Sequence, residues 1–177
     1  MPALTKFMAM PLNTRLPPFG SAWHSDWSFQ ASPPAATLLH AKIIPSCGGD
    51  TLFAAGCGRV FDGTFEQLAD SLQRISALPT ETLVCCAHEY TLANLGFAAW
   101  VEPESESLRE RTRQAQALRQ RGEPTLPSPL SLELETNPFL RTGNPGVIAA
   151  ASRYAGRSLP DHRAVFRALR EWKDTEY

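Results

Sequence analysis

Two pairs of residues in this sequence have types and spacings that could do chemistry. The first is His24 and Asp26, an H-x-D pair in "WHSDWSF". Residues two apart on a β-strand project to the same face, so both side chains could reach one metal ion. Such a pair, with a distant second histidine, forms the ligand triad of non-haem Fe(II) oxygenases. By itself the pair is a weak signal, because suitable residues often fall at this spacing by chance.

The second pair is Arg170 and Lys173 in "LREWKD", near the end of the sequence. Residues three apart are neighbours on one face of a helix, where two cations can hold a carboxylate between them. The same pair could instead be a solvated helix end, since the helix dipole favours cations near its C-terminus. The residues alone leave both interpretations open.

A longer stretch around the first pair resembles the taurine/2-oxoglutarate dioxygenase family. It covers residues 23–54, "WHSDWSFQASPPAATLLHAKIIPSCGGDTLFA". The resemblance implies that His24 and Asp26 bind iron and that Thr51, in G-G-D-T, contacts 2-oxoglutarate. The second histidine and the cosubstrate-binding arginine of that family have no counterpart here. This resemblance therefore predicts a fragment of an Fe(II)/2-oxoglutarate-dependent dioxygenase without a complete iron site.

Four further motifs fall in the order and spacing of another family. They are "GDTLFAAGCGRVFDGT", "CCAHEYTLANLGFA", "GEPTLPSPLSLELETNPFLR" and "FRALREWKD". Over residues 49–174 the chain resembles glyoxalase II, the hydroxyacylglutathione hydrolases of the metallo-β-lactamase superfamily. The resemblance implies hydrolysis of S-D-lactoylglutathione to D-lactate and glutathione at a dinuclear metal centre. A metal suits this reaction because it lowers the pKa of bound water and polarises the thioester carbonyl.

This second resemblance also implies which residues form the site. Asp50 is expected to bridge the metals, and His88 is expected to be a terminal ligand. Outside the family context, a histidine after an apolar strand is more often a buried, hydrogen-bonded side chain. Phe61 stands where the family often has tyrosine, so a hydroxyl contact is lost. The expected glutathione contacts are Arg59, Phe61, Tyr90, Asn94, Arg170 and Lys173.

The main metal-binding motif of glyoxalase II, T-H-x-H-x-D-H, is absent from the sequence, which has four histidines. The two resemblances meet in "GGDTLFA". We therefore expect a truncated or chimeric chain, with a dioxygenase-like segment over residues 1–53 and a glyoxalase II C-terminal region over residues 54–177. Hydrolase activity is expected to be weak or absent, so whether the chain is an enzyme stays open.

Three hypotheses for function follow from these motifs. In the first, the chain keeps the binding of glutathione or its thioester but hydrolyses little. In the second, a rebuilt zinc or iron site forms where four ligands converge, namely His24, Asp26, Asp50 and His88. In the third, the chain is a non-enzymatic homo-oligomer whose exposed sheet edges pair between copies.

The elements that must position these residues predict an α+β fold, with a β-rich N-terminal segment followed by a mainly helical region. Thr64 and Gln67 form a capping-box pattern before apolar residues at helical spacing. On a helix over residues 91–100, Leu92, Leu95 and Ala99 are expected to recur on one face. The other predicted elements are helices over residues 105–121, 145–154 and 161–172, strands over 27–29, 36–45, 50–55 and 82–87, and an extended loop over 124–141.

Composition limits the class of protein. Apolar residues make up 43% of the 177 residues, which is enough for a packed core, and the net charge is -1. This balance argues against a dedicated nucleic-acid binder or a polybasic membrane anchor. No apolar run approaches the ~20 residues of a membrane helix, and the N-terminus lacks a signal-peptide pattern. Four cysteines without a C-x-x-C pair are typical of cytoplasmic thiols.

Overall fold

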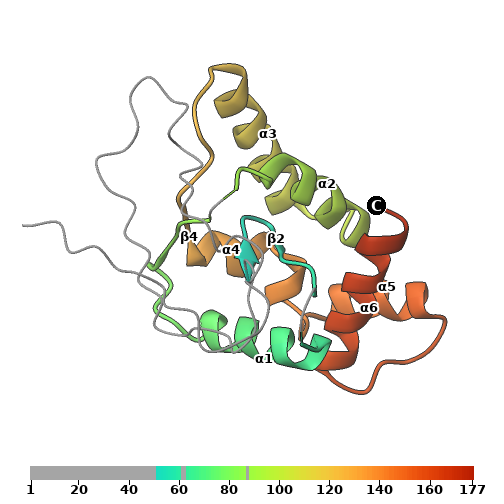
Figure 1. Ribbon diagram of the computed structural model, residues 1–177. Coiled ribbons are helices and arrows are strands. Elements are labelled where there is room, and N and C mark those ends of the chain that lie inside the picture. Colours follow the sequence, from blue (N-terminus) through green and yellow to red (C-terminus); the bar gives the residue numbers. More distant parts are fainter. Residues whose placement is uncertain (1–50, 61–62, 87) are drawn as a thin grey trace, which may run out of the picture.

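The computed structural model describes residues 51–60, 63–86 and 88–177, and Figure 1 shows how their helices and short strands are arranged. Most of this part of the chain is helical, in agreement with the predicted C-terminal region. The strands predicted over residues 27–29 and 36–45 lie outside the described residues. So do four predicted site residues, which are His24, Asp26, Asp50 and Phe61.

A short hairpin begins the described chain and lies among the helices (Figure 1). Strand β1 (Leu52–Phe53) pairs antiparallel with β2 (Gly56–Cys57). Strand β1 lies within the strand predicted over residues 50–55, and β2 lies just after it. Ala54 and Ala55 form the turn, and both are almost fully buried. Ala55 has a φ of 56°, which residues with a Cβ rarely adopt. A buried turn with this backbone needs contacts from elsewhere in the chain.

Helix α1 (Phe65–Ser76) begins at the predicted capping box, which is confirmed. The Thr64 hydroxyl accepts a hydrogen bond from the Gln67 N–H, and the Gln67 side chain accepts one from the Thr64 N–H. These reciprocal bonds satisfy two backbone donors that a helix start would otherwise leave unpaired. Leu72, at the predicted helical spacing, is buried in the core.

Helices α5 (Pro145–Ala155) and α6 (His162–Thr175) confirm the two C-terminal helices, and α6 continues past residue 172. The Asp161 carboxylate caps α6 by accepting a hydrogen bond from the Ala164 N–H at 2.8 Å. Helix α6 packs against both α1 and α5. It is therefore the central helix of this half of the molecule (Figure 1).

Helices α2 (Thr91–Val101) and α3 (Glu106–Gln120) pack against each other, and both were predicted. Of the three apolar residues predicted to recur on one face of α2, Leu95 is buried, whereas Leu92 and Ala99 are exposed. Most residues of α2 are apolar, so their spacing does not select one face. Its polar Asn94 is buried instead, for reasons that lie in the site below.

The extended loop predicted over residues 124–141 is wrong. This segment forms strand β4 (Ser128–Pro129), helix α4 (Leu130–Thr136) and a 3-10 turn, η1 (Pro138–Leu140). Pro129 ends β4 and Pro138 begins η1, positions where a missing N–H costs little. Strand β4 pairs antiparallel with β3 (Leu83–Val84). The strand predicted over 82–87 is thus shorter than expected, and Leu83 is 59% exposed rather than buried.

The core between α1, α2, α5, α6 and η1 is rich in aromatic rings. Phe97 stacks on Phe139 with ring centroids 5.8 Å apart, and Trp172 meets Phe97 edge-on at 5.6 Å. Phe139 also contacts Phe166, and both rings are almost fully buried. This aromatic layer lies directly beneath the cationic residues of the candidate site.

Within the described ranges, no helix combines the length and apolar character needed to cross a membrane.

Candidate functional site

Four of the predicted substrate-binding side chains come together where the end of α6 meets the β1–β2 hairpin and α2. They are Arg59, which follows β2, Asn94 of α2, and Arg170 and Lys173 of α6. The sequence placed these residues in three separate motifs, and the fold brings the motifs to one place. Each side chain is held by a different set of contacts, which decides what it can do.

Arg170 is buried, with 2% of its surface exposed, so the interpretation as a solvated helix end is wrong. Its Nη1 donates to the Cys57 carbonyl oxygen at 3.2 Å. Its Nε and Nη2 donate to the two carboxylate oxygens of Asp174 at 3.1 and 2.9 Å. The guanidinium lies 5.3 Å from the centre of the Phe139 ring, a cation–π distance. Arg170 therefore pins α6 to the hairpin.

Arg59 is the exposed cation of the group. Its Nε lies 3.1 Å from the Asp174 Oδ1, and 64% of its side chain is open to solvent. No hydrogen bond to another described residue uses its terminal nitrogens. Among the described residues its terminal nitrogens thus have no hydrogen-bond partner, and such a guanidinium is suited to two-point binding of a carboxylate.

Lys173 is half-buried and points into the same corner. Its Nζ donates to the Asn94 Oδ1 and lies 5.5 Å from the centre of the Phe97 ring. Burial, together with the nearby positive charge of Arg170, lowers the pKa of Lys173 to about 8. Lys173 thus gives up its proton far more easily than a surface lysine does.

Asn94 connects this lysine to the hairpin turn. Its Nδ2 donates to the Ala54 carbonyl oxygen at 2.9 Å while its Oδ1 accepts from Lys173. A Cβ added to Gly56 would lie 2.6 Å from the Asn94 side chain, so only glycine leaves room for it. Asn94 is therefore held between the hairpin turn and Lys173.

Cys57 lies beneath the two α6 cations. Burial raises the pKa of the Cys57 thiol, and the charges of Arg170 and Lys173 oppose that rise. The net direction is upward, so Cys57 remains a neutral thiol that contributes packing and a backbone carbonyl. Among the described residues, the carboxylate in contact with the cations of this corner is that of Asp174.

A second group of predicted residues lies around Phe53 of the hairpin. The Tyr90 ring stacks on His88 with centroids 5.2 Å apart and an interplanar angle of 18°. It also packs against Phe53 of β1 at 5.3 Å, and Tyr90 is 50% exposed. Thr51, the predicted cosubstrate contact, is half-buried, and its carbonyl oxygen accepts from the Gly58 N–H. This group offers an exposed aromatic hydroxyl beside an imidazole.

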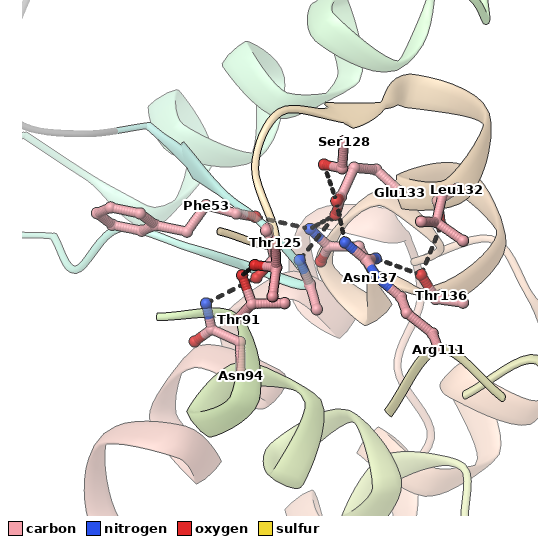
Figure 2. A network of polar contacts seen from close by, with 12 residues as sticks. Phe53, Thr91, Asn94, Arg111, Thr125, Ser128, Leu132, Glu133, Thr136 and Asn137 are labelled. Atoms are coloured by element: carbon pink, nitrogen blue, oxygen red, sulfur yellow. Dashed lines mark hydrogen bonds and ion pairs between the residues drawn. The ribbon is translucent and has the colours of Figure 1, made fainter. Parts of the chain in front are cut away.

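The hairpin that carries both groups is held by a buried carboxylate that the sequence did not single out. Figure 2 shows Glu133 of α4 at the centre of this network. Its Oε2 accepts from the Ala55 N–H at 2.8 Å, which stabilises the unusual turn backbone. Its Oε1 accepts from Ser128 at 2.6 Å and from Arg111 of α3. Glu133 and Arg111 are 0% and 5% exposed, so this is a buried ion pair.

Asn137 completes the hold on the hairpin. Its Nδ2 donates to the Gly56 carbonyl oxygen at 3.0 Å and to the Phe53 carbonyl oxygen at 3.3 Å (Figure 2). Arg111 also donates to the Thr136 hydroxyl. The one sequence signal for this network was that Glu133 and Asn137 fall inside a recognised motif, "LELETNPFLR". Nothing in the local pattern marked them as buried.

Glu89 holds the start of α2 to the segment before β4. Its carboxylate accepts from the Thr125 N–H at 3.0 Å and from the hydroxyl of Thr91 at 3.0 Å. This latch fixes the chain on both sides of Tyr90. Neither Glu89 nor Thr125 was predicted to have a role.

The predicted metal site cannot be assembled from the described residues. His88 is the one predicted ligand among them, and within residues 51–60, 63–86 and 88–177 no three His, Cys, Asp or Glu side chains converge. The site proposed to join His24, Asp26, Asp50 and His88 thus stays a prediction. The described residues alone do not fit a complete zinc or iron centre.

About half of the chain matches the model of a known protein family. Residues 89–176 match the family model described as "Hydroxyacylglutathione hydrolase C-terminus". The match includes Tyr90, Asn94, Arg170 and Lys173, and also the network residues Glu133 and Asn137. The match ends beyond Asp174. Of the residues that meet at the end of α6, it therefore includes Asn94, Arg170, Lys173 and Asp174, but not Arg59 or Cys57.

Several bacterial relatives are similar over a longer stretch. A hydroxyacylglutathione hydrolase of Alkalilimnicola ehrlichii is 58% identical over 144 residues, which cover 80% of this chain and 56% of the relative. One of Xanthomonas euvesicatoria pv. vesicatoria is 56% identical over the same shares. One of Nitrosomonas europaea is 52% identical over 126 residues, covering 71% of this chain and 48% of the relative. The chain spans about half the length of the curated relatives it matches.

The longer alignments also bear on the segment that resembles a dioxygenase. An alignment that covers 80% of 177 residues has to begin before residue 49. It therefore reaches into residues 23–54, which the dioxygenase resemblance also covers. These relatives support the resemblance to the hydrolases. They give no support to a fusion with a dioxygenase.

Proposed function

We propose that this chain binds glutathione and its thioesters, because residues 89–176 match the family model described as "Hydroxyacylglutathione hydrolase C-terminus". S-D-lactoylglutathione, which a hydroxyacylglutathione hydrolase converts to D-lactate and glutathione, is the substrate that this resemblance implies. The observation that carries the proposal is the convergence of Arg59, Arg170 and Lys173 on one corner. Glutathione carries two carboxylates, and a cationic corner on an aromatic floor is suited to one of them.

The contacts of each residue suggest a division of roles. Arg59 offers its exposed fork to a carboxylate, while Lys173 contributes a second positive charge from a half-buried position. Arg170 is saturated by internal partners, so its role is to fix the corner and not to reach outward. Tyr90, which is half exposed and packs against Phe53 of the hairpin, is suited to contact another part of the tripeptide.

Hydrolysis would need a metal centre, and the family resemblance implies zinc or iron. His88 is the predicted ligand that the described residues offer, with Asp50 expected from the chain just before β1. Because this set does not make a complete centre, we expect weak or no hydrolysis from the chain itself. Among the described residues, no contact supports the alternative interpretation as a fragment of a dioxygenase.

Ligand binding tests the proposal directly. We expect S-methylglutathione to shift the backbone amide signals of residues around Arg59 and Lys173 in NMR titrations. Arg59→Gln is expected to weaken binding at least about fivefold, because a charge-assisted two-point contact is lost. Arg167→Gln is the matched control, since it removes the same kind of charge from α6, where Arg167 pairs with Glu171 at the surface. Equal affinities for wild type and Arg59→Gln would refute the assigned corner.

Activity is tested on the same preparation. Hydrolysis of S-D-lactoylglutathione is measured alongside the zinc and iron content of the purified protein, before and after chelation. Turnover that follows metal content supports a functional centre that includes His88. Turnover that is unchanged after chelation would contradict the metal-dependent reaction.

A further inference from the structure

Asp174 lies between two cations that come from opposite ends of the described chain. Its Oδ1 is 3.1 Å from the Arg59 Nε and accepts from the Arg170 Nη2 at 2.9 Å. Its Oδ2 accepts from the Arg170 Nε at 3.1 Å. The Asp174 side chain is 31% exposed, whereas that of Arg170 is 3% exposed. One carboxylate is thus shared by a buried guanidinium and an exposed one.

The geometry of this carboxylate is that of a bound carboxylate ligand. A side-by-side contact of two carboxylate oxygens with Nε and Nη2 is the usual two-point arrangement between arginine and a carboxylate. Asp174 makes this arrangement with Arg170 and adds a contact to Arg59. An incoming carboxylate meets Arg59 already engaged at its Nε, and it meets the negative charge of Asp174 at the same corner.

Other charged groups at the corner do not replace this effect. Lys173 faces Asn94 and the aromatic rings, and Cys57 faces Arg170 as a neutral thiol. Glu171, one turn away on α6, is engaged with Arg167 at 2.8 Å. Asp174 is therefore the carboxylate that neutralises the corner in the described part of the chain.

We propose that Asp174 is a built-in competitor for the carboxylate of glutathione, which releases Arg59 when the ligand binds. This inference rests on the proposed function, because it concerns the same corner. In the free chain Asp174 keeps Arg59 folded over the end of α6 and offsets its charge. On binding, the ligand carboxylate takes the Arg59 fork, and Asp174 stays with Arg170. Asp174 thereby limits affinity and favours release of a glutathione product.

The experiment compares Asp174→Asn with Glu171→Gln by calorimetric titration of S-methylglutathione. Both changes remove one negative charge from the same helix, but only the first removes it from the corner. We expect Asp174→Asn to bind at least about fivefold more tightly than wild type at low salt, since a like charge near the ligand is removed. The gain should shrink as salt screens the corner. Glu171→Gln should bind like wild type.

Two further measurements separate this role from a structural one. Asp174→Glu keeps the charge and should return the affinity toward that of wild type. The dimethyl ester of S-methylglutathione has no carboxylate, so the gain from Asp174→Asn should vanish with it. Circular dichroism of Asp174→Asn checks that the helices remain, and Asp174→Ser is the replacement variant if the asparagine protein is unfolded.

The outcomes divide cleanly. The expected result is tighter binding by Asp174→Asn, an affinity near that of wild type for Asp174→Glu, and no gain from Asp174→Asn with the diester. Equal or weaker binding by a folded Asp174→Asn, with wild type still binding, overturns the role of Asp174 and leaves the proposed function standing. Absence of binding in wild type and in every variant overturns both proposals.

Discussion

Replacing the buried carboxylate of Glu133 should remove a large part of the stability of this chain. In Glu133→Gln the carboxylate becomes an amide, which has one oxygen to accept hydrogen bonds and an NH₂ group that can only donate. Four donors face this side chain, from Ala55, Arg111, Ser128 and Asn137. The amide cannot accept from all four, and its NH₂ group must face at least one of them.

The larger effect comes from Arg111, whose guanidinium is 5% exposed and would be left without a charged partner. Removing one member of a buried ion pair typically costs about 3–5 kcal/mol. We expect a loss of this size from a domain whose total stability is about 5–15 kcal/mol. With a urea slope of about 2 kcal/mol per molar, the unfolding midpoint should fall by about 2 M.

Urea unfolding followed by circular dichroism measures this loss, and Glu135→Gln is the control on the same helix. Glu135 is exposed, so its substitution should change stability by no more than about 0.5 kcal/mol. The double variant Arg111→Met with Glu133→Leu should recover part of the loss, because no unpaired charge remains. A loss below about 1 kcal/mol for Glu133→Gln would refute the reasoning that this pair holds the hairpin.

Three other changes test separate parts of the structure. Thr64→Ala removes the capping box of α1 and should cost about 1 kcal/mol in urea unfolding; Thr64→Ser, which keeps the hydroxyl, should cost little, and equal losses for both would contradict the assignment. Gly56→Ala places a methyl group 2.6 Å from the Asn94 side chain, so it should lower stability and weaken S-methylglutathione binding together; a gain in either would be unexpected. The pKa of Lys173 is lowered to about 8 by burial and by Arg170, so its ammonium loses its proton as pH rises through that value. Binding of S-methylglutathione should therefore weaken between about pH 7 and pH 9, and Lys173→Arg, which stays charged, should flatten that part of the titration; an unchanged pH profile would contradict it.

Features that depend on neighbouring residues were predictable from the sequence. The capping box at Thr64 and the cap at Asp161 are set by hydrogen bonds that reach three residues along the chain. The family motifs likewise placed Arg59, Asn94, Arg170 and Lys173 in one site before any geometry was known. The caps lie within a few residues of the helices that they begin, whereas the common site of these distant residues was known only through the family resemblance.

Burial of polar groups was not predictable in this way. In "SLELET" two glutamates stand two residues apart, and nothing local tells the buried Glu133 from the exposed Glu135. The difference is made by the Ala55 N–H, which lies 78 residues earlier and needs an acceptor inside the protein. The loop prediction for residues 124–141 failed for the same reason, since α4 is fixed by contacts with the hairpin and α3.

The pair Arg170 and Lys173 shows how these two limits combine at the site. Their spacing correctly placed them side by side on α6, but spacing says nothing about which of them faces solvent. Arg170 donates its hydrogen bonds to Asp174 and to the Cys57 carbonyl oxygen, so the accessible guanidinium is that of Arg59. The corner is therefore made by the hairpin as much as by α6. Because Glu133 and Asn137 fix that hairpin, a loss of their contacts should disturb the placement of Arg59 before it unfolds α6.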